Sequence, residues 1–487
     1  MSMLILISGL YALLMVTDHV PAIGLGLLAL LWLLHWIFTG RLTYASPMDL
    51  PILVMLGLLP LSLVISIDPS LSLPKIYGLV LSIALFFVII NLLRNYQRLK
   101  LAILALIILG LGTALLGLLV SPRMISRLPQ LATLFPLGAT ENGVNPNTVG
   151  GALTFFVPLL TGLLFDGGAY KRVYLEDQPR LRLLAQKLLV LFTLVIVAIV
   201  LILTRSRGAY LGSAVGLAAF AIWKDRRFLW LIPLLLVVFA AAFFIFAEGD
   251  LWTIIQVVDT ADDAVTLPSR LTTWRGSIHL IQDFPFTGTG IGTYSRLYTN
   301  LYTINPFPDQ MATSFHPHNT FLAVAVDLGI PALVLYTALL TSFALTIQRS
   351  FKYGRSITQV LLMGVACGVL AHQVFGIMDS FLLGTKLGVI QWIFFGIAAA
   401  IYIHKSGFHW RKSAASLPNQ HADNPTGGQP FALHLTNLLI GLVTWAACSL
   451  AAITFLSFSP LFSLAIAVIG GVLLGVTLTH RHRKLRR

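Results

Sequence analysis

Apolar residues are gathered along this chain into runs of roughly 17 to 25 residues, which short polar segments separate. A helix of that length crosses about 30 Å of hydrocarbon at about 1.5 Å per residue. Strands of a membrane β-barrel would instead give alternating segments of about ten residues. The pattern predicts an all-α polytopic membrane protein with about 14 transmembrane helices, at 2–16, 20–39, 49–67, 75–93, 100–120, 147–166, 188–204, 209–223, 228–247, 319–347, 357–377, 383–403, 432–457 and 460–479.

The distribution of basic residues predicts the orientation of these spans. With a cytoplasmic N-terminus, 23 of the 32 Lys and Arg residues fall on the cytoplasmic side and nine on the other. Cytoplasmic loops of membrane proteins carry such an excess. We therefore expect an integral, multi-pass protein with both termini in the cytoplasm.

One polar stretch, at 248–318, is too long for a simple connection between spans, so we expect it to fold over the extracytoplasmic membrane surface. It is predicted to contain short amphipathic helices. Within it, Leu271, Trp274, Ile278 and Ile281 recur at spacings of three and four, which indicates such a helix over 270–282.

The predicted spans and polar segments divide the chain into four parts. They are a membrane core of about 12 helices including the outer loop (1–403), a cytoplasmic linker (404–430), two additional transmembrane helices (431–480) and a basic cytoplasmic tail (481–487).

Composition agrees with this class, because 57% of the residues are hydrophobic and only 10% are charged, far from the values of soluble domains. The net charge of +14 does not indicate nucleic-acid binding, since the basic residues lie in short clusters between apolar runs. The two cysteines, Cys367 and Cys448, lie inside apolar runs and indicate neither a disulfide framework nor a thiolate metal site.

Three arginines on the extracytoplasmic side are candidates for binding an anion. Arg205 and Arg207 lie in the tight turn Thr204–Gly208, and Arg270 opens the predicted amphipathic helix. They are either side chains that reach the lipid headgroups or a clamp for phosphate oxygens, which a guanidinium binds in pairs. Together they make up a third of the nine cations on that side.

Two histidines, His316 and His318, lie where the outer loop re-enters the membrane. They are either interfacial side chains without chemistry or acid–base groups, because an imidazole titrates near neutral pH and can take a proton from a hydroxyl. A zinc site is the weaker reading, since no convincing third ligand lies near them in the sequence.

Several other polar groups have mainly structural interpretations. Asn145-Pro146-Asn147 has the pattern of a turn and helix N-cap. Gly288-Thr289-Gly290-Ile291-Gly292 is predicted to be a flexible turn, because it follows no strand. His372, Asp379 and Asp327 are ionisable groups within or beside spans, with either a structural or a functional role.

Four of these motifs together resemble the O-antigen ligase and O-antigen polymerase superfamily of bacterial envelopes. They are Thr204–Gly212 (TRSRGAYLG), Arg270–Trp274 followed by Asp283–Gly290 (DFPFTGTG), His318-Asn319 followed by Gly329-Ile330-Pro331, and the Asn145-Pro146-Asn147 turn. The resemblance covers about 150–340.

The resemblance implies a metal-independent, cofactor-free membrane glycosyltransferase of the bacterial cytoplasmic membrane. Its donor would be a saccharide on polyprenyl (undecaprenyl) diphosphate and its acceptor a glycan or glycolipid, with membrane lipid as the surroundings and no nucleic acid. The family's functional histidine falls on His318 and its arginines on Arg207 and Arg270, so we expect these three to be catalytic. Substrate binding is then expected of Arg205, Asn319, His316, Asn145 and Asn147.

Two alternatives remain open at this point. A transporter, for bicarbonate or as a flippase for lipid-linked glycans, would place its polar groups near the bilayer midplane, whereas here they gather at one boundary. A structural envelope protein would not need the arginine and histidine pattern. The sequence does not separate a ligase from a polymerase.

Overall fold

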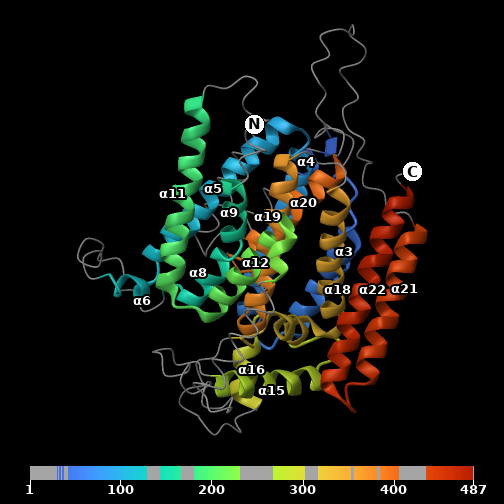
Figure 1. Ribbon diagram of the computed structural model, residues 1–487. Helices are drawn as coiled ribbons and strands as arrows, with labels where there is room; N and C mark the ends of the chain where they lie inside the picture. Colours follow the sequence, from blue (N-terminus) through green and yellow to red (C-terminus); the bar gives the residue numbers. More distant parts are fainter. Residues whose placement is uncertain are drawn as a thin grey trace.

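The computed structural model of the protein describes residues 42–128, 143–165, 180–230, 267–301, 316–351, 356–380, 384–385, 387–404 and 435–485, with a few residues between 30 and 37. In this part of the chain the secondary structure is helical, and most helices lie side by side as a bundle (Figure 1). The predicted all-α fold class is confirmed for these residues.

The helices follow the predicted spans closely. In chain order they are α3 (Asp49–Ile65), α4 (Pro69–Leu92), α5 (Tyr96–Leu119), α6 (Pro122–Ile125), α8 (Pro146–Leu153), α9 (Phe156–Phe165), α11 (Arg180–Thr204), α12 (Arg207–Lys224), η2 (Arg226–Trp230), α15 (Leu267–Asp283), α16 (Tyr294–Leu301), α18 (Thr320–Ser350), α19 (Ser356–Met378), α20 (Val389–Ile403), α21 (Leu435–Thr454) and α22 (Pro460–Leu485).

Among the described residues, eight helical segments are long and apolar enough to cross a membrane, and α3 and α20 are shorter apolar helices. The predicted span 2–16, most of the spans 20–39 and 228–247 and all but the first residue of the linker 404–430 lie outside the described residues. The total of about 14 spans therefore stays a prediction.

Several predicted boundaries were wrong by six to eight residues. Helix α11 begins at Arg180 and not at 188, α20 begins at Val389 and not at 383, and polar residues continue α4 and α22 past their apolar runs. Helix α4 begins at Pro69 and not at 75, since the Asp68 side chain accepts a hydrogen bond from the Ser70 amide and caps the helix there. Helix α22 extends to Leu485 and not to 479, so most of the basic segment 481–487 is helical.

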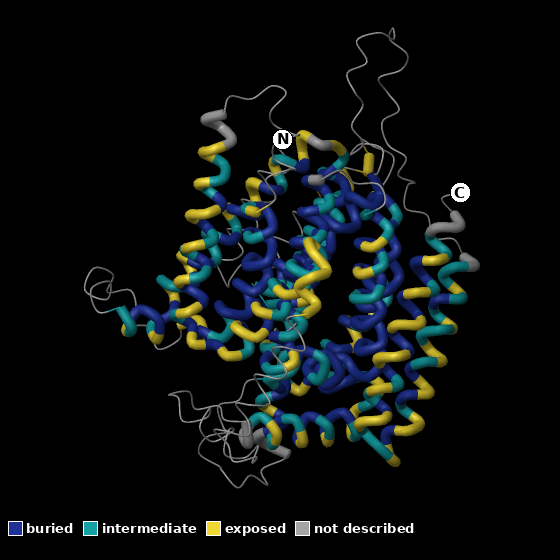
Figure 2. The backbone as a smooth tube through the Cα atoms, viewed as in Figure 1, coloured by how far each residue is buried: buried dark blue, intermediate teal, exposed yellow. Residues whose placement is uncertain are grey.

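Burial divides the helices into a centre and a lipid-compatible surface (Figure 2). Helices α18 and α20 are buried along nearly their whole length. Helices α5, α11 and α22 instead expose stripes of large apolar side chains, among them Leu101, Ile108, Phe192, Ile199 and Leu473. Stripes of this size are costly in water, and they fit a hydrocarbon environment.

Small residues bring helices α12 and α19 into close contact. Gly208, Gly212 and Gly216 recur every four residues on α12 and face α19, where a Cβ at Gly216 would lie 2.8 Å from the Ala371 Cβ. Such spacing lets helix backbones approach closely in a membrane. As a result, the start of α12 lies beside the end of α19.

The two C-terminal helices are part of the bundle and lie along α18 (Figure 1). Gly471 and Gly475 of α22 leave room for α18. The Trp445 indole of α21 donates a hydrogen bond to the Pro331 carbonyl oxygen at 3.0 Å. The helices predicted as additions thus brace α18 near its kink at Gly329.

Candidate functional site

Helix α18 begins at the end of the bundle that carries α15 and α16 (Figure 1), called the α15 end below. Asn319 caps α18, because its Oδ1 accepts hydrogen bonds from the Phe321 and Leu322 amides at 2.9 and 3.1 Å. Its Nδ2 donates to the Ile377 carbonyl oxygen at 3.1 Å. These bonds occupy the amide and favour a positioning role over the predicted substrate contact.

The residue before this cap, His318, has a φ of 50°, a left-handed conformation that is uncommon for residues other than glycine. The His318 amide lies 3.3 Å from Nδ1 of His316, to which it donates a hydrogen bond. The two imidazole rings are 4.3 Å apart. The short turn between the loop and α18 therefore holds both histidines together.

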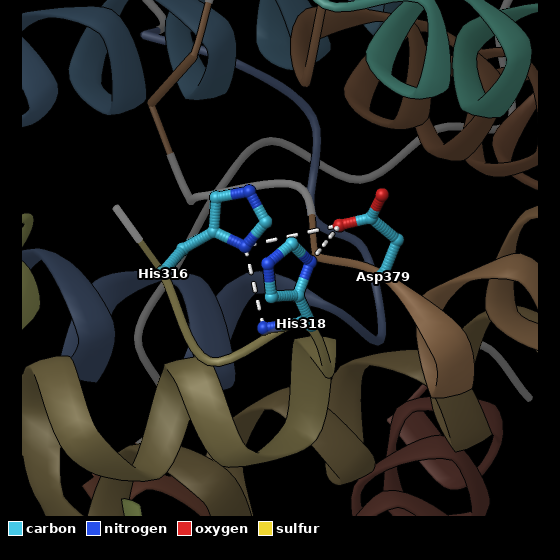
Figure 3. Close-up of side chains that lie close together, drawn as sticks. All are labelled: His316, His318 and Asp379. Carbon is cyan, nitrogen blue, oxygen red and sulfur yellow. Dashed lines mark hydrogen bonds and ion pairs between the residues drawn. The ribbon is translucent and has the colours of Figure 1, made fainter. Parts of the chain in front are cut away.

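Asp379 lies directly after α19 and next to both histidines (Figure 3). Its Oδ1 is 3.1 Å from Nδ1 of His318 and 3.8 Å from Nδ1 of His316. Burial opposes ionisation of this carboxyl, but hydrogen bonds from His318 and the Ser380 amide and the charge of the histidines hold its pKa below the usual value. An ionised Asp379 accepts the Nδ1 proton of His318, which leaves Nε2 of His318 as the basic nitrogen.

His316 is held in a different state by its own partners. Ser380 Oγ lies 2.8 Å from Nδ1 of His316. Because that nitrogen already accepts the His318 amide, the hydroxyl is the donor to it. Burial lowers the pKa of His316 to about 4, and Arg270 and Lys75 act in the same direction while Asp379 opposes them. His316 is therefore a neutral ring that supports His318 through its backbone.

The expectation that the two histidines lack a third metal ligand was wrong. His316, His318 and Asp379 each offer one ligand atom, and these atoms lie within 4.8 Å of one another. Two imidazoles and a carboxylate form a donor set that zinc accepts. In the described geometry, however, the nitrogen atoms nearest Asp379 take part in hydrogen bonds to Asp379, Ser380 and the backbone.

The glycine-rich run that was predicted to be a flexible turn is instead a packed clasp on α18. Gly288, Gly290 and Gly292 all have positive φ. The Thr289 amide donates to the Val326 carbonyl oxygen at 2.8 Å, and the Gly292 amide to Oδ1 of Asp327 at 3.2 Å. These bonds fasten the segment after α15 to the kinked part of α18.

Helix α15, predicted from its apolar spacing, carries Arg270 in its first turn. Of the predicted stripe, Ile281 is buried, Trp274 and Ile278 are half-buried and Leu271 is exposed. Thr273, Ser277 and Leu280 are also buried. The Tyr294 hydroxyl of α16 donates to the Thr273 carbonyl oxygen. With the clasp, these contacts fix α15 on α18 and bring Arg270 within electrostatic range of His316.

Arg205 and Arg207 lie in the turn between α11 and α12, and both are exposed. Arg205 adopts a φ of 54°, and the Ser206 hydroxyl caps α12 by accepting the Ala209 amide at 3.3 Å. Next in the chain, Gly208 faces α19, and a Cβ there would lie 3.4 Å from the Met378 Cβ. Gly208 directly follows Arg207, and Met378 directly precedes Asp379. This contact therefore brings the arginine turn close to the end of α19.

Helix α8 meets the same turn. A Cβ at Gly150 would lie 3.1 Å from the Ser206 Cβ. The Asn145 Oδ1 caps α8 by accepting the Asn147 amide at 2.9 Å, as the structural interpretation predicted. The Asn145–Asn147 turn is therefore held by its own bonds, less than two helical turns from the contact with Ser206.

Two of the ionisable groups within spans serve the fold. His372 makes a hydrogen bond with the Gly151 carbonyl oxygen at 3.0 Å and stacks on Phe155 at 4.1 Å. Asp327 is buried and holds the clasp at Gly292. Asp379 was singled out only as an ambiguous boundary group, and Ser380 was not singled out at all. In the sequence, the one indication that Asp379 and Ser380 belong to the site was their predicted position on the same side of the membrane as His318.

Comparison with known families identifies part of this region. A family described as O-antigen ligase matches residues 192–337, which include the arginine turn, α15, the clasp and His318. No curated protein matches the chain. Residues 192–337 are thus similar to the O-antigen ligase family, and this match supports the resemblance of the chain to the O-antigen ligase and O-antigen polymerase superfamily.

Proposed function

We propose that this protein transfers a saccharide from a polyprenyl diphosphate donor to a hydroxyl of an acceptor glycan at the extracytoplasmic membrane surface. The O-antigen ligase domain supports a membrane glycosyltransferase at the level of the family. The structural observation that carries the proposal is the 3.1 Å contact between Nδ1 of His318 and Oδ1 of Asp379 where α18 and α19 meet.

His318 is the proposed general base. With its Nδ1 proton donated to Asp379, its Nε2 has a free lone pair and can accept the proton of the acceptor hydroxyl. Asp379 then stabilises the imidazolium that forms and keeps the ring in one orientation. His316 and Asn319 are proposed to position His318, through its amide and through the cap of α18.

Arg207 and Arg270 are the proposed ligands of the diphosphate, with Arg205 beside them. A guanidinium stays charged in a poorly hydrated site and binds two phosphate oxygens at once. It can stabilise the negative charge that builds on the leaving diphosphate, a task that a divalent metal performs in other enzymes. The electrostatic effect of Arg270 on His316 supports its placement near the base.

The reaction is a single displacement in which the atoms balance. The acceptor oxygen forms a bond to the anomeric carbon as the bond from that carbon to the phosphate oxygen breaks. The acceptor proton passes to His318, and polyprenyl diphosphate leaves with the electron pair. One displacement inverts the configuration at the anomeric carbon.

A transporter remains the second candidate function. In the described residues, however, the histidine–aspartate cluster lies at the end of the bundle, and the two buried ionisable groups His372 and Asp327 within the spans are engaged with the backbone. A solute path needs polar groups near the midplane that solute can reach. This arrangement favours the enzyme.

The test is transfer by purified protein in proteoliposomes that contain a polyprenyl diphosphate saccharide and an acceptor glycan. We expect product with the wild-type chain and none above background with His318→Ala, and we expect a chelator such as EDTA to leave the rate unchanged. Loss of transfer with EDTA and its recovery with zinc would instead assign His316, His318 and Asp379 to a metal. Donor movement across the bilayer without product would favour the flippase.

A further inference from the structure

Lys75, in the second turn of α4, lies where two segments of the candidate site come together. A Cβ at Gly292, in the clasp after α15, would lie 3.2 Å from Cγ of Lys75. Gly384, in the segment after Asp379, packs so closely that a Cβ there would collide with the Lys75 carbonyl oxygen. Both glycines have a φ of 82°, which L side chains rarely adopt. The contacts place Lys75 at the α15 end, beside the segments that carry the site.

The charge of Lys75 acts on two groups in this region. One is Asp327, the buried carboxyl that accepts the Gly292 amide. The other is His316, on which Arg270 also acts. The carboxyl of Asp379 is already engaged with His318 and with the Ser380 amide. The surroundings of His316 therefore hold positive charge that fits an anionic ligand.

We propose that Lys75 is a further donor-binding residue whose ammonium group contacts a phosphate oxygen of the diphosphate, beside Arg270. This inference rests on the proposed function. A lysine ammonium is a compact charge with three donors, so one lysine can face the Asp327 carboxylate and a phosphate oxygen together. Lys75 comes from an element outside the matched domain at 192–337, so the donor site would include α4 as well.

A purely structural role for Lys75 makes a different prediction. If the lysine only compensates the charge of Asp327, then its removal weakens the clasp, and a neutral residue at 327 cancels the defect. Asn at 327 keeps an oxygen for the Gly292 amide, so the clasp hydrogen bond survives in the double variant. If the lysine binds the donor, neutralising Asp327 does not restore binding.

The experiment compares three variants: Lys75→Met, which keeps a long unbranched side chain but removes its charge, Lys75→Arg, and Arg123→Met. Arg123 is an exposed cation on α6, which projects from the side of the bundle (Figure 1). Purified proteins in proteoliposomes are assayed for initial rate against donor concentration and for inhibition by inorganic pyrophosphate. We expect Lys75→Met to raise both the donor KM and the inhibition constant of pyrophosphate by about tenfold or more, through loss of a charge-assisted hydrogen bond. Lys75→Arg should recover most of the affinity, and Arg123→Met should match wild type.

Two results would overturn the assignment of Lys75. One is an unchanged KM and inhibition constant in Lys75→Met. The other is a return to wild-type values in Lys75→Met combined with Asp327→Asn. The same assay of His318→Ala keeps the two proposals apart, because activity retained in that variant refutes the proposed function, whatever Lys75 does.

Discussion

His318 and Asp379 are 61 residues apart in the chain, yet Nδ1 of one lies 3.1 Å from Oδ1 of the other. Helix α18 follows the histidine and α19 precedes the aspartate. The Asn319 amide bonds the Ile377 carbonyl oxygen, and the Thr320 hydroxyl lies 3.5 Å from the Asp379 carbonyl oxygen. The pair is thus fixed by backbone contacts on both sides of it, which makes it suitable for testing by substitution.

Asp379→Asn should lower kcat by about 10²–10⁴-fold with little change in the amount of folded protein. The amide NH₂ of asparagine favours the wrong tautomer of His318, with the proton on Nε2. Ser380→Ala is the matched control, because Ser380 Oγ bonds His316 and not His318. Equal rates for Asp379→Asn and wild type in the transfer assay would exclude Asp379 as the partner of a base.

Arg270→Ala and Arg207→Ala should each raise the donor KM about tenfold or more and lower kcat, because each removes a bidentate phosphate contact. Lysine at either position should recover only part of the loss, since it keeps the charge without the fork. Arg296→Ala is the control: Arg296 is 63% exposed and forms a surface ion pair with Asp68 at 3.5 Å. The donor KM and kcat of each variant are measured in proteoliposomes. Equal effects of all three alanine substitutions would argue against a specific role of Arg207 and Arg270 in binding the donor.

Gly212→Leu should destabilise the protein by about 1–3 kcal/mol and abolish most activity, because its side chain would collide with the Ala371 carbonyl oxygen and separate α12 from α19. Gly112→Leu on α5 is the matched control, since nothing lies within 4 Å of a Cβ there. Thermal unfolding in detergent measures the stability of both variants. Activity retained in Gly212→Leu would show that Arg207 does not need the α12–α19 contact.

His316 predicts a pH dependence of stability. Its folded-state pKa is about 4, below the ordinary 6.5, so between these values the unfolded chain binds a proton that the folded chain does not. Stability should therefore fall as the pH drops from about 6.5 towards 4. The lowered pKa of Asp379 adds a loss only below its ordinary value of 3.8.

His316→Gln should remove the first of these effects, so the fall in unfolding temperature from pH 7 to pH 5 should become smaller than in wild type. Gln keeps an acceptor for the Ser380 hydroxyl, which limits other damage to the fold. Thermal unfolding at the two pH values makes the comparison. An identical fall in both proteins would contradict a neutral, buried His316.

The sequence predicted the membrane class, the helix that carries Arg270 and the apolar spans that the structure describes between α3 and α22, with boundaries that differ by up to eight residues. These predictions succeeded because apolar runs and the helical spacing of apolar residues are local properties that can be recognised in a short stretch of sequence. The motifs around Arg207, Arg270 and His318 also sufficed for the resemblance that the family match over 192–337 supports.

Only the tertiary structure decided that Asp379 is the partner of His318, that the Gly288–Gly292 run is a clasp and that Lys75 lies beside Gly292 and Gly384. Each depends on which helices meet, and although the spacing of Gly208, Gly212 and Gly216 is visible in the sequence, it does not say that α19 is the helix they contact. From the sequence alone, the glycines of a flexible turn cannot be distinguished from those of a packed turn, because the difference lies in the residues that they contact. The chemistry at the α15 end therefore arises from long-range packing, whereas the helices that hold it arise from local pattern.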